Sequence, residues 1–267
     1  MPPPPEPPPA PRDAAAVVLA YGESPFLAGC LASLAAQTVP VRIVVATSTP
    51  SDAIARAAAA AGAELLVNPE RAGIAGDWNF GLTATPARFV TLAHQDDTYR
   101  PAFTERTLAA FAACPDAVLC FTGYQEVDDA GRPKSSKVSR AKHLIEAAAL
   151  GRATRVAGAR LRAFLSFGNP LPCSSVTFDR ARLPGFRFGD AYASNLDWEA
   201  WWRLYSEGRV FARAPERLVG RRHNRLTATS GLIRDGVRLR EDREMFRRLW
   251  PAPLGEALAL IYRAGYQ

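Results

Sequence analysis

The 267-residue sequence is poor in cysteine and has no long hydrophobic run. Its four cysteines form no CxxC pair, which excludes a disulfide scaffold and indicates reduced thiols in a cytoplasmic protein. A membrane-spanning helix is not expected, because no stretch of about 18 uncharged apolar residues occurs. Residues 1–13 are rich in proline and lack the apolar segment of a secretory signal. We therefore expect a disordered tail followed by a globular fold.

Several familiar motifs are also absent, namely the P-loop, GxGxxG, GxSxG and HExxH. Basic residues outnumber acidic ones, 33 against 26, for a net charge of +7. The excess is concentrated in residues 213–248, which hold eleven arginines and five acidic residues. This basic face could meet an anionic membrane surface or a phosphorylated substrate, or it could be a solvated helical surface. Nucleic acid is not expected as a partner, because few aromatic residues lie among the arginines.

From residue 14 onward, short apolar runs alternate with segments of helical periodicity. Such alternation predicts an α/β fold with a mostly parallel central sheet flanked by helices. In these sheets, ligands bind beyond the carboxyl ends of the strands. The expected strands are 14–20, 41–46, 64–67, 88–93 and 118–124. The first expected helix begins at Ser24, and the next three span 51–61, 74–83 and 101–113.

After Asp128 the alternation ends. We expect a polar loop at 129–142, one long helix at 143–167 and a short strand at 175–178. An aromatic-rich helix at 196–207 and two short strands at 209–212 and 217–221 should follow, and then a C-terminal extension of two amphipathic helices at 237–263.

The strongest candidate site is Asp96-Asp97, which follows the fourth expected strand. Two adjacent carboxylates repel each other, and Mg²⁺ or Mn²⁺ would relieve that repulsion. The cation could also neutralise a departing diphosphate. Either residue could instead cap the next helix or belong to a polar loop, but the position at the mouth of a parallel sheet favours function.

Two later segments hold further candidates. Asp197 opens a helix with three tryptophans, and rings that exclude water suit a carboxylate that acts as general base. The alternative for Asp197 is a helix N-cap, and Glu199 is the second candidate for the base. Arg222 and His223 lie in a basic segment that suits a diphosphate, although a single histidine is often structural.

Three segments occur in an order that resembles the GT-A glycosyltransferases of family 2. They are 34–38 (LAAQT), 73–81 (GIAGDWNFG) and 90–97 (VTLAHQDD), and the resemblance extends over residues 15–229. It implies a GT-A fold and transfer of a sugar, with inversion, from a nucleotide-diphosphate donor. The acceptor would be a hydroxyl of a glycan, a lipid-linked carrier or another molecule, in surface glycan or polysaccharide biosynthesis.

The resemblance also implies roles for individual residues. Asp97 is similar to the family's metal ligand, and His223 could complete the metal shell. Asp197 is similar to the catalytic base, and His94 could touch the donor. The implied donor-binding residues are Ala20, Tyr21, Glu23, Thr47, Arg71, Asn79, Asp96 and Arg222, and the implied acceptor-binding residues are Ser174, Ser175 and Trp198.

The sequence departs from the family pattern at several points. Where family members commonly have an aspartate after the second strand, this chain has Thr47-Ser48, which leaves the nucleobase open. Leu196 stands where a glutamate is usual before the base. Arg71 could contact a phosphate or be a solvated loop charge.

The resemblance divides the chain into four parts. Residues 1–13 are the tail, 14–128 the nucleotide-sugar-binding half, 129–230 the acceptor-binding half of the same domain, and 231–267 the C-terminal helices. Two other functions are considered, a nucleotidyltransferase that makes sugar nucleotides and a non-catalytic nucleotide- or glycan-binding module. The first would need a basic, glycine-rich loop after the first strand, where this chain has an acidic one. We expect a cytoplasmic enzyme whose basic C-terminal third could touch the inner face of the membrane.

Overall fold

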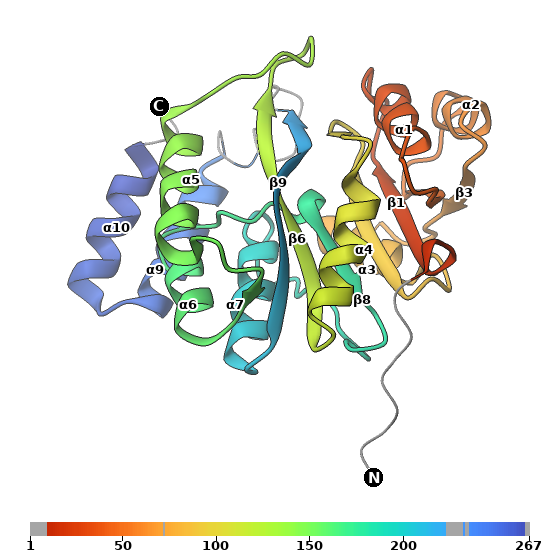
Figure 1. The fold of residues 1–267 in the computed structure, drawn as a ribbon. Helices are drawn as coiled ribbons and strands as arrows, with labels where there is room; N and C mark the ends of the chain where they lie inside the picture. The colour runs from red at the N-terminus through yellow and green to blue at the C-terminus, as the bar shows by residue number, and fades with distance from the viewer. Residues whose placement is uncertain (1–9, 72, 223–231, 233–234, 265–267) are drawn as a thin grey trace.

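The computed structural model describes residues 10–71, 73–222, 232 and 235–264. They form three layers, a central sheet with helices on both faces (Figure 1). The expected α/β fold is confirmed. Of the predicted tail, residues 1–9 lie outside the described residues, whereas Pro11–Asp13 form a short 3-10 helix directly before the first strand.

The sheet has nine strands in the order β3-β2-β1-β4-β8-β6-β9-β5, and β7 pairs with β9. Strands β1 to β4 are mutually parallel, β6 and β9 run in the same direction, and β8 is antiparallel between β4 and β6. The bounds are β1 Ala14–Ala20, β2 Arg42–Thr47, β3 Glu64–Val67, β4 Phe89–His94, β5 Thr98–Tyr99, β6 Ala117–Val127, β7 Arg155–Val156, β8 Val176–Asp179 and β9 Val210–Arg222.

Helices cover both faces of the sheet because its central strands are apolar on both sides. In β1, Ala15 and Val17 face α3, α6 and α7, whereas Ala16 and Val18 face α1, α2 and α4, as the two-residue period of a strand requires. The bounds are α1 Leu27–Ala35, α2 Asp52–Ala60, α3 Gly73–Thr83, α4 Phe103–Ala113, α5 Lys137–Leu150, α6 Gly158–Leu165, α7 Leu196–Ser206, α9 Val237–Leu249 and α10 Ala252–Ala264.

The second half differs from the sequence-based expectation at α5 and α6. The predicted loop 129–142 ends early, because Ser136 and Ser139 form a capping box that starts α5 at Lys137. The predicted single helix 143–167 is two helices. They separate at Gly151, whose φ of 53° favours glycine and ends α5.

A β-bulge joins the two predicted strands 209–212 and 217–221 into the single strand β9. Thr122 of β6 pairs with Ala214, and the next residue, Gly123, pairs with Arg217, so that residues 215–216 have no partner in β6. A proline is tolerated in a strand at such a bulge. Gly123 leaves room for it, because a Cβ there would lie 3.1 Å from the carbonyl oxygen of Glu216.

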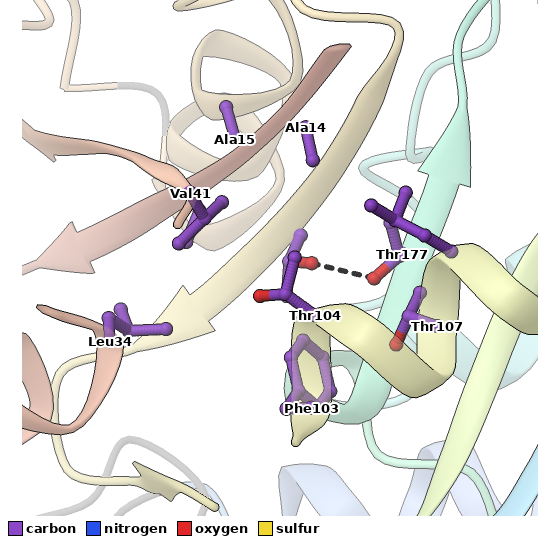
Figure 2. Close-up of a pocket in the computed structure, with 11 residues that line it drawn as sticks. Ala14, Ala15, Leu34, Val41, Phe103, Thr104, Thr107 and Thr177 are labelled. Carbon is purple, nitrogen blue, oxygen red and sulfur yellow. Dashed lines mark hydrogen bonds between the residues drawn. The ribbon is translucent and has the colours of Figure 1, made fainter. Parts of the chain in front are cut away.

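A small cavity of about 10 Å³ lies near the amino-terminal end of β1 (Figure 2). Ala14, Val41 and Thr107 are among its lining residues, and beside it the hydroxyls of Thr91 and Thr177 lie 2.6 Å apart. A volume of this size suits at most one water molecule. The cavity is at the opposite end of the strands from the predicted ligand site, so it is not a substrate pocket.

Candidate active site

The candidate site lies where the chain order of the strands reverses, at the carboxyl ends of β1 and β4. From β1 the chain continues to β2 and β3 on one side, and β4 pairs with β1 on the other. Gln95 joins the two strand ends: its Nε2 donates to the carbonyl of Tyr21 at 2.9 Å, and its Oε1 accepts from the Tyr21 amide at 3.3 Å. Such switch points are the usual ligand sites of α/β sheets.

Asp96 lies at this switch point, in the loop directly after β4. The Ser24 hydroxyl donates to its Oδ1 at 2.8 Å, and the side chain remains partly exposed. Burial raises the pKa of Asp96, and the Ser24 hydrogen bond offsets part of that rise. A partly desolvated carboxylate that retains free acceptor positions is suited to a divalent cation.

Asp97, the expected metal ligand, is turned inward. It is only 3% exposed, and its Oδ1 accepts a hydrogen bond from the Arg222 amide at 2.9 Å. Burial raises the pKa of Asp97, while the nearby Ser174 side chain and the Arg222 amide offset part of the rise. Asp96 is thus the more exposed of the two carboxylates, Asp97 joins β9 to the loop after β4, and the metal-binding role of Asp97 stays a prediction.

Arg222 makes several internal contacts in this arrangement, and its role in donor binding stays a prediction. Its guanidinium donates to the carbonyl oxygens of Asp96, at 3.0 Å, and Asp128. It also stacks on the Phe26 ring, with Cζ 4.2 Å from the ring centre. The buried side chain is thus committed to internal contacts. The neighbouring Arg221 is partly exposed, and its positive charge acts on His94 and Asp97.

His94 lies at the centre of the site. Its ring is 5.3 Å from that of Trp78, and its Nε2 is buried with no hydrogen-bond partner within the described residues. Burial, and to a lesser extent the charge of Arg221, lower the pKa of His94 from 6.5 to about 4 against the opposing charges of Asp197 and Asp96. The imidazole is therefore neutral at neutral pH, and both carboxylates are close enough to act on its charge.

The buried imidazole makes stability depend on pH. Because the pKa of His94 is lower in the folded than in the unfolded chain, the unfolded chain binds more protons between pH 6.5 and 4. The free energy of unfolding should therefore fall as the pH is lowered through this window, by up to about 3 kcal/mol from this group. Urea titrations at several pH values measure the free energy of unfolding. Its decrease with falling pH should be steeper for the metal-free protein than for His94→Gln. Equal slopes for the two proteins would contradict the prediction.

Asp197 lies in the first turn of α7, with 9% of its surface exposed. The N-cap position is occupied by Asn195, so Asp197 is not the N-cap. Its Oδ1 accepts a hydrogen bond from the Trp198 amide at 2.8 Å. Its negative charge raises the pKa values of both His94 and Cys173, so the carboxylate is near these two side chains. This position suits the role of general base.

Helix α9 fixes the segment that leads into α7. The Glu241 carboxylate accepts hydrogen bonds from three successive backbone amides, those of Ala193, Ser194 and Asn195, at 2.7, 2.8 and 2.9 Å. Arg238 of the same helix donates to the carbonyl and hydroxyl of Ser194. The C-terminal extension is thus part of the framework that holds Asp197.

Several predicted ligand-binding residues instead hold the fold together. Asn79 donates to the carbonyl of Phe188 at 2.9 Å and accepts from its amide at 2.8 Å. Trp198 is fully buried, and its indole nitrogen donates to Leu165 at 2.8 Å. The Ser175 hydroxyl donates to Pro172. These side chains are thus engaged in internal contacts, and their roles in donor and acceptor binding stay predictions.

The other predicted residues divide by exposure. Tyr21, Glu23 and Arg71 are exposed, with Tyr21 and Glu23 just beyond β1. Ala20 and Thr47 are buried at the ends of β1 and β2. The remaining predicted residues are Ser174, which is fully buried beneath Asp97, and His223, which lies outside the described residues.

Glu199, the second candidate for the base, points elsewhere. It lies near Arg203 and Arg248, at 3.7 and 3.9 Å. Residues two positions apart lie on different faces of a helix, so Glu199 cannot share the surroundings of Asp197.

Among the described residues, no group of three or more histidine, cysteine, aspartate or glutamate side chains is arranged to hold a metal ion. All four cysteines are buried and unpaired. No helix in the described part of the chain has the length and hydropathy needed to cross a bilayer.

Sequence reasoning missed two polar groups that the fold brings into the site. One group is Glu241, which is one of several acidic residues on the arginine-rich helix α9. The only sequence signal for its burial is its position four residues before Met245, on the buried face of the helix. The second group is Asp77 of α3. In the structure it binds Ser48 and Asn68, which follow β2 and β3.

Comparison with known proteins bears on this site. The model of the family described as glycosyl transferase family 2 matches residues 15–168. The fold is similar to that of a TarS fragment from S. aureus in complex with UDP-GlcNAc, with a TM-score of 0.64 and 16% identity over 94% of this chain and 70% of that one. It is also similar to glucosyl-3-phosphoglycerate synthase from Mycobacterium tuberculosis in complex with Mn²⁺, UDP and phosphoglyceric acid, with a TM-score of 0.58 and 18% identity over 85% and 79% of the two chains. No curated protein matches the sequence.

Proposed function

Because the chain belongs to glycosyl transferase family 2, we propose that it moves a sugar from a nucleotide-diphosphate donor to an acceptor hydroxyl, with inversion at the sugar carbon. The observation that carries this proposal is the surroundings of His94. Asp96 from the first half of the chain and Asp197 from the second both act on the charge of this one side chain. This proximity supports a site at the switch point of the sheet that takes both the donor and the acceptor.

Asp197 is the proposed base. Its carboxylate takes the proton of the acceptor hydroxyl as the hydroxyl oxygen attacks the anomeric carbon. The bond from that carbon to the diphosphate oxygen breaks in the same step, and the nucleoside diphosphate leaves with the bonding electrons. Because attack and departure occur on opposite faces of the carbon, one displacement inverts its configuration. Arg221 supplies positive charge near the departing group.

A divalent cation, Mg²⁺ or Mn²⁺, fits the crevice at Asp96. The fit rests on a carboxylate whose charged form is disfavoured by burial, beside an imidazole nitrogen that has no partner within the described residues. Asp96 would hold the ion, and His223 is a further proposed ligand. Such an ion would supply positive charge to the diphosphate.

The proposed donor is a UDP-sugar. Two solved structures of similar fold support this proposal, because they contain UDP-GlcNAc or UDP. Tyr21, Glu23 and Thr47 lie at the strand ends where the nucleotide would sit, and Arg71 is a proposed phosphate contact. The acceptor is proposed to be a hydroxyl of a glycan, a lipid-linked carrier or another molecule in surface glycan or polysaccharide biosynthesis.

We further propose that the enzyme acts in the cytoplasm and touches the inner face of the membrane through its C-terminal third. Helix α10 supports this contact, because Leu260 and Ile261 are 65% and 71% exposed. The arginines of α9 add positive charge, although Arg243 and Arg247 are both paired with Glu256. The four buried thiols are consistent with a reducing compartment.

A thermal-shift screen tests the proposed donor. We expect UDP-sugars in the presence of Mn²⁺ to raise the melting temperature of the protein, because a ligand that binds only the folded state stabilises it by mass action. UDP-, dTDP-, GDP- and CMP-sugars are compared with and without Mn²⁺. A melting temperature that no nucleotide sugar changes would contradict the proposed function.

A further inference from the structure

Large apolar side chains are exposed around helices α5 and α10. Within the part of the chain that the structure describes, seven large apolar side chains are exposed, and five of them belong to α5, to α10 or to the residue after Ser166. These five are Leu144, Phe167, Leu254, Leu260 and Ile261. An exposed apolar patch is characteristic of a surface that meets another molecule.

Helix α10 is apolar on both faces. Its inner face packs on α9 so closely that a Cβ on Gly255 would lie 2.9 Å from the carbonyl oxygen of Phe246. Its outer face carries Leu254, Ala257 and Ile261, which share one side of the helix because of their spacing and are all exposed. A helix that is apolar all round is normally covered on every side. The outer face of α10 is therefore suited to an apolar partner.

Helix α5 extends this exposed area. Its outer face carries Ala141, Leu144 and Ala148, which are all exposed. Lys142 of the same helix reaches α10, since its Nζ lies 5.8 Å from the centre of the Tyr262 ring, and Figure 1 shows the two helices next to each other. The residues that we call the α5–α10 surface are Leu144, Phe167, Leu254, Ala257, Leu260 and Ile261.

The α5–α10 surface is connected to the candidate active site through one short segment. The ring of Phe167 lies 5.3 Å from that of Trp250, and the Tyr262 hydroxyl of α10 accepts a hydrogen bond from the Asn169 amide at 3.3 Å. From there the chain continues into the 3-10 helix η2, Cys173–Ser175, which adjoins both carboxylates of the site, Asp97 and Asp197. A molecule bound at this surface would thus lie beside the segment that leads into the site.

The charges around the surface indicate what kind of molecule fits it. Arg140 of α5 and Arg263 of α10 are exposed. Each helix has one acidic residue, and both are neutralised, because Glu146 pairs with an arginine of β9 and Glu256 with two arginines of α9. Apolar residues bordered by basic ones complement an anionic lipid interface. They do not complement a second copy of the chain, because a two-fold interface would bring the same basic residues together.

We propose that the α5–α10 surface docks on an anionic lipid bilayer. The inference rests on the proposed function for the membrane contact of α10, and it adds α5, Phe167 and the charge of the lipid. Leu144 and Ile261 enter the layer between headgroups and acyl chains, while Arg140 and Arg263 meet the lipid phosphates. This orientation holds the segment before η2 at the bilayer, so among the proposed acceptors it favours a hydroxyl on a lipid-linked carrier.

Co-sedimentation of the whole chain with lipid vesicles tests the proposal. We expect vesicles of phosphatidylglycerol mixed with phosphatidylcholine to bind the protein about 10-fold or more tightly than pure phosphatidylcholine vesicles, because each arginine near an anionic surface adds a factor of about five. The difference should shrink as the salt concentration is raised from about 0.1 M to about 1 M. Equal binding to both kinds of vesicle, or no binding to either, would overturn the proposal.

The variants Leu144→Glu and Ile261→Glu then locate the contact. Each should weaken binding to the anionic vesicles by about 10-fold or more, the contribution of one large apolar side chain. Both side chains are exposed, so the melting temperature should stay that of the wild type. The matched control is Ala59→Glu, which adds the same charge to an exposed position of α2 and should retain binding. Unchanged binding in both test variants, or an equal loss in the control, would overturn the proposal.

Two further measurements separate this proposal from its rivals. Calorimetry with UDP and Mn²⁺ reports on the proposed function alone: a protein that binds UDP but not vesicles would overturn only the docking surface, whereas one that binds vesicles but no nucleotide would overturn only the proposed function. Analytical ultracentrifugation without lipid tests the other occupant. We expect no dimer that depends on this surface, and a dimer that Ile261→Glu converts to a monomer would assign the surface to a second copy and overturn the proposal.

Discussion

Replacing Asp197 with asparagine is expected to lower kcat by about 100-fold or more, the usual contribution of a general base. Asparagine has the same shape and can still accept the hydrogen bond from the Trp198 amide, but it cannot take the proton of the acceptor hydroxyl. Donor binding and melting temperature should stay close to those of the wild type. Steady-state kinetics and calorimetry with the donor nucleotide measure the two effects separately.

Glu199→Gln is the matched control for this experiment. It makes the same chemical change two residues along the same helix, in a side chain that lies near Arg203 and Arg248 instead of the strand ends. We expect it to retain kcat. The assignment of the base would be wrong if Glu199→Gln lost activity while Asp197→Asn kept it. A variant Asp197→Asn with full activity would instead favour a non-catalytic role for the carboxylate.

Replacing Glu241 with alanine is expected to lower the free energy of unfolding by about 4 kcal/mol, a large effect for one substitution. The change removes three hydrogen bonds to a charged group and leaves the amides of Ala193, Ser194 and Asn195 without their partner. Because Ser194 and Asn195 are buried, water cannot readily replace the carboxylate. Urea denaturation followed by circular dichroism measures the loss.

The control for Glu241 lies on the same helix. Glu244 is exposed, so Glu244→Ala should change stability by less than about 0.5 kcal/mol. Glu241→Gln should fall between the two, since its one remaining carbonyl oxygen can still accept hydrogen bonds. A loss for Glu241→Ala no larger than that for Glu244→Ala would show that α9 does not fix the segment before α7.

Local patterns predicted the first half of the fold well. The apolar run of β1 and the helical spacing of Leu27, Cys30, Leu31 and Leu34 record their burial directly in the sequence. The second half was harder, because its boundaries depend on partners far along the chain. Strand β9 contains Pro215, which reads as a break, and its continuity depends on the pairing with β6 around Gly123.

The site could be located from sequence, but the roles of its residues could not all be assigned. Asp96 and Asp97 are chemically identical neighbours, and only the amide of Arg222, 125 residues after Asp97, decides which of them turns inward. Asn79 has a side chain that is common in ligand-binding sites, yet its amide group forms two hydrogen bonds with the backbone of Phe188, 109 residues away. Such long-range pairings leave no local periodicity from which to infer them.

The hold of Glu241 on residues 193–195 also affects the order in which the working enzyme forms during translation. A nascent polypeptide leaves the ribosome amino terminus first, and its early segments begin to fold there. Strands β1 to β4 can pair at that stage. The hydrogen bonds that fix residues 193–195 need Glu241, which is synthesised 46 to 48 residues later. The segment that leads into α7 is therefore expected to reach its final position only after α9 has been synthesised.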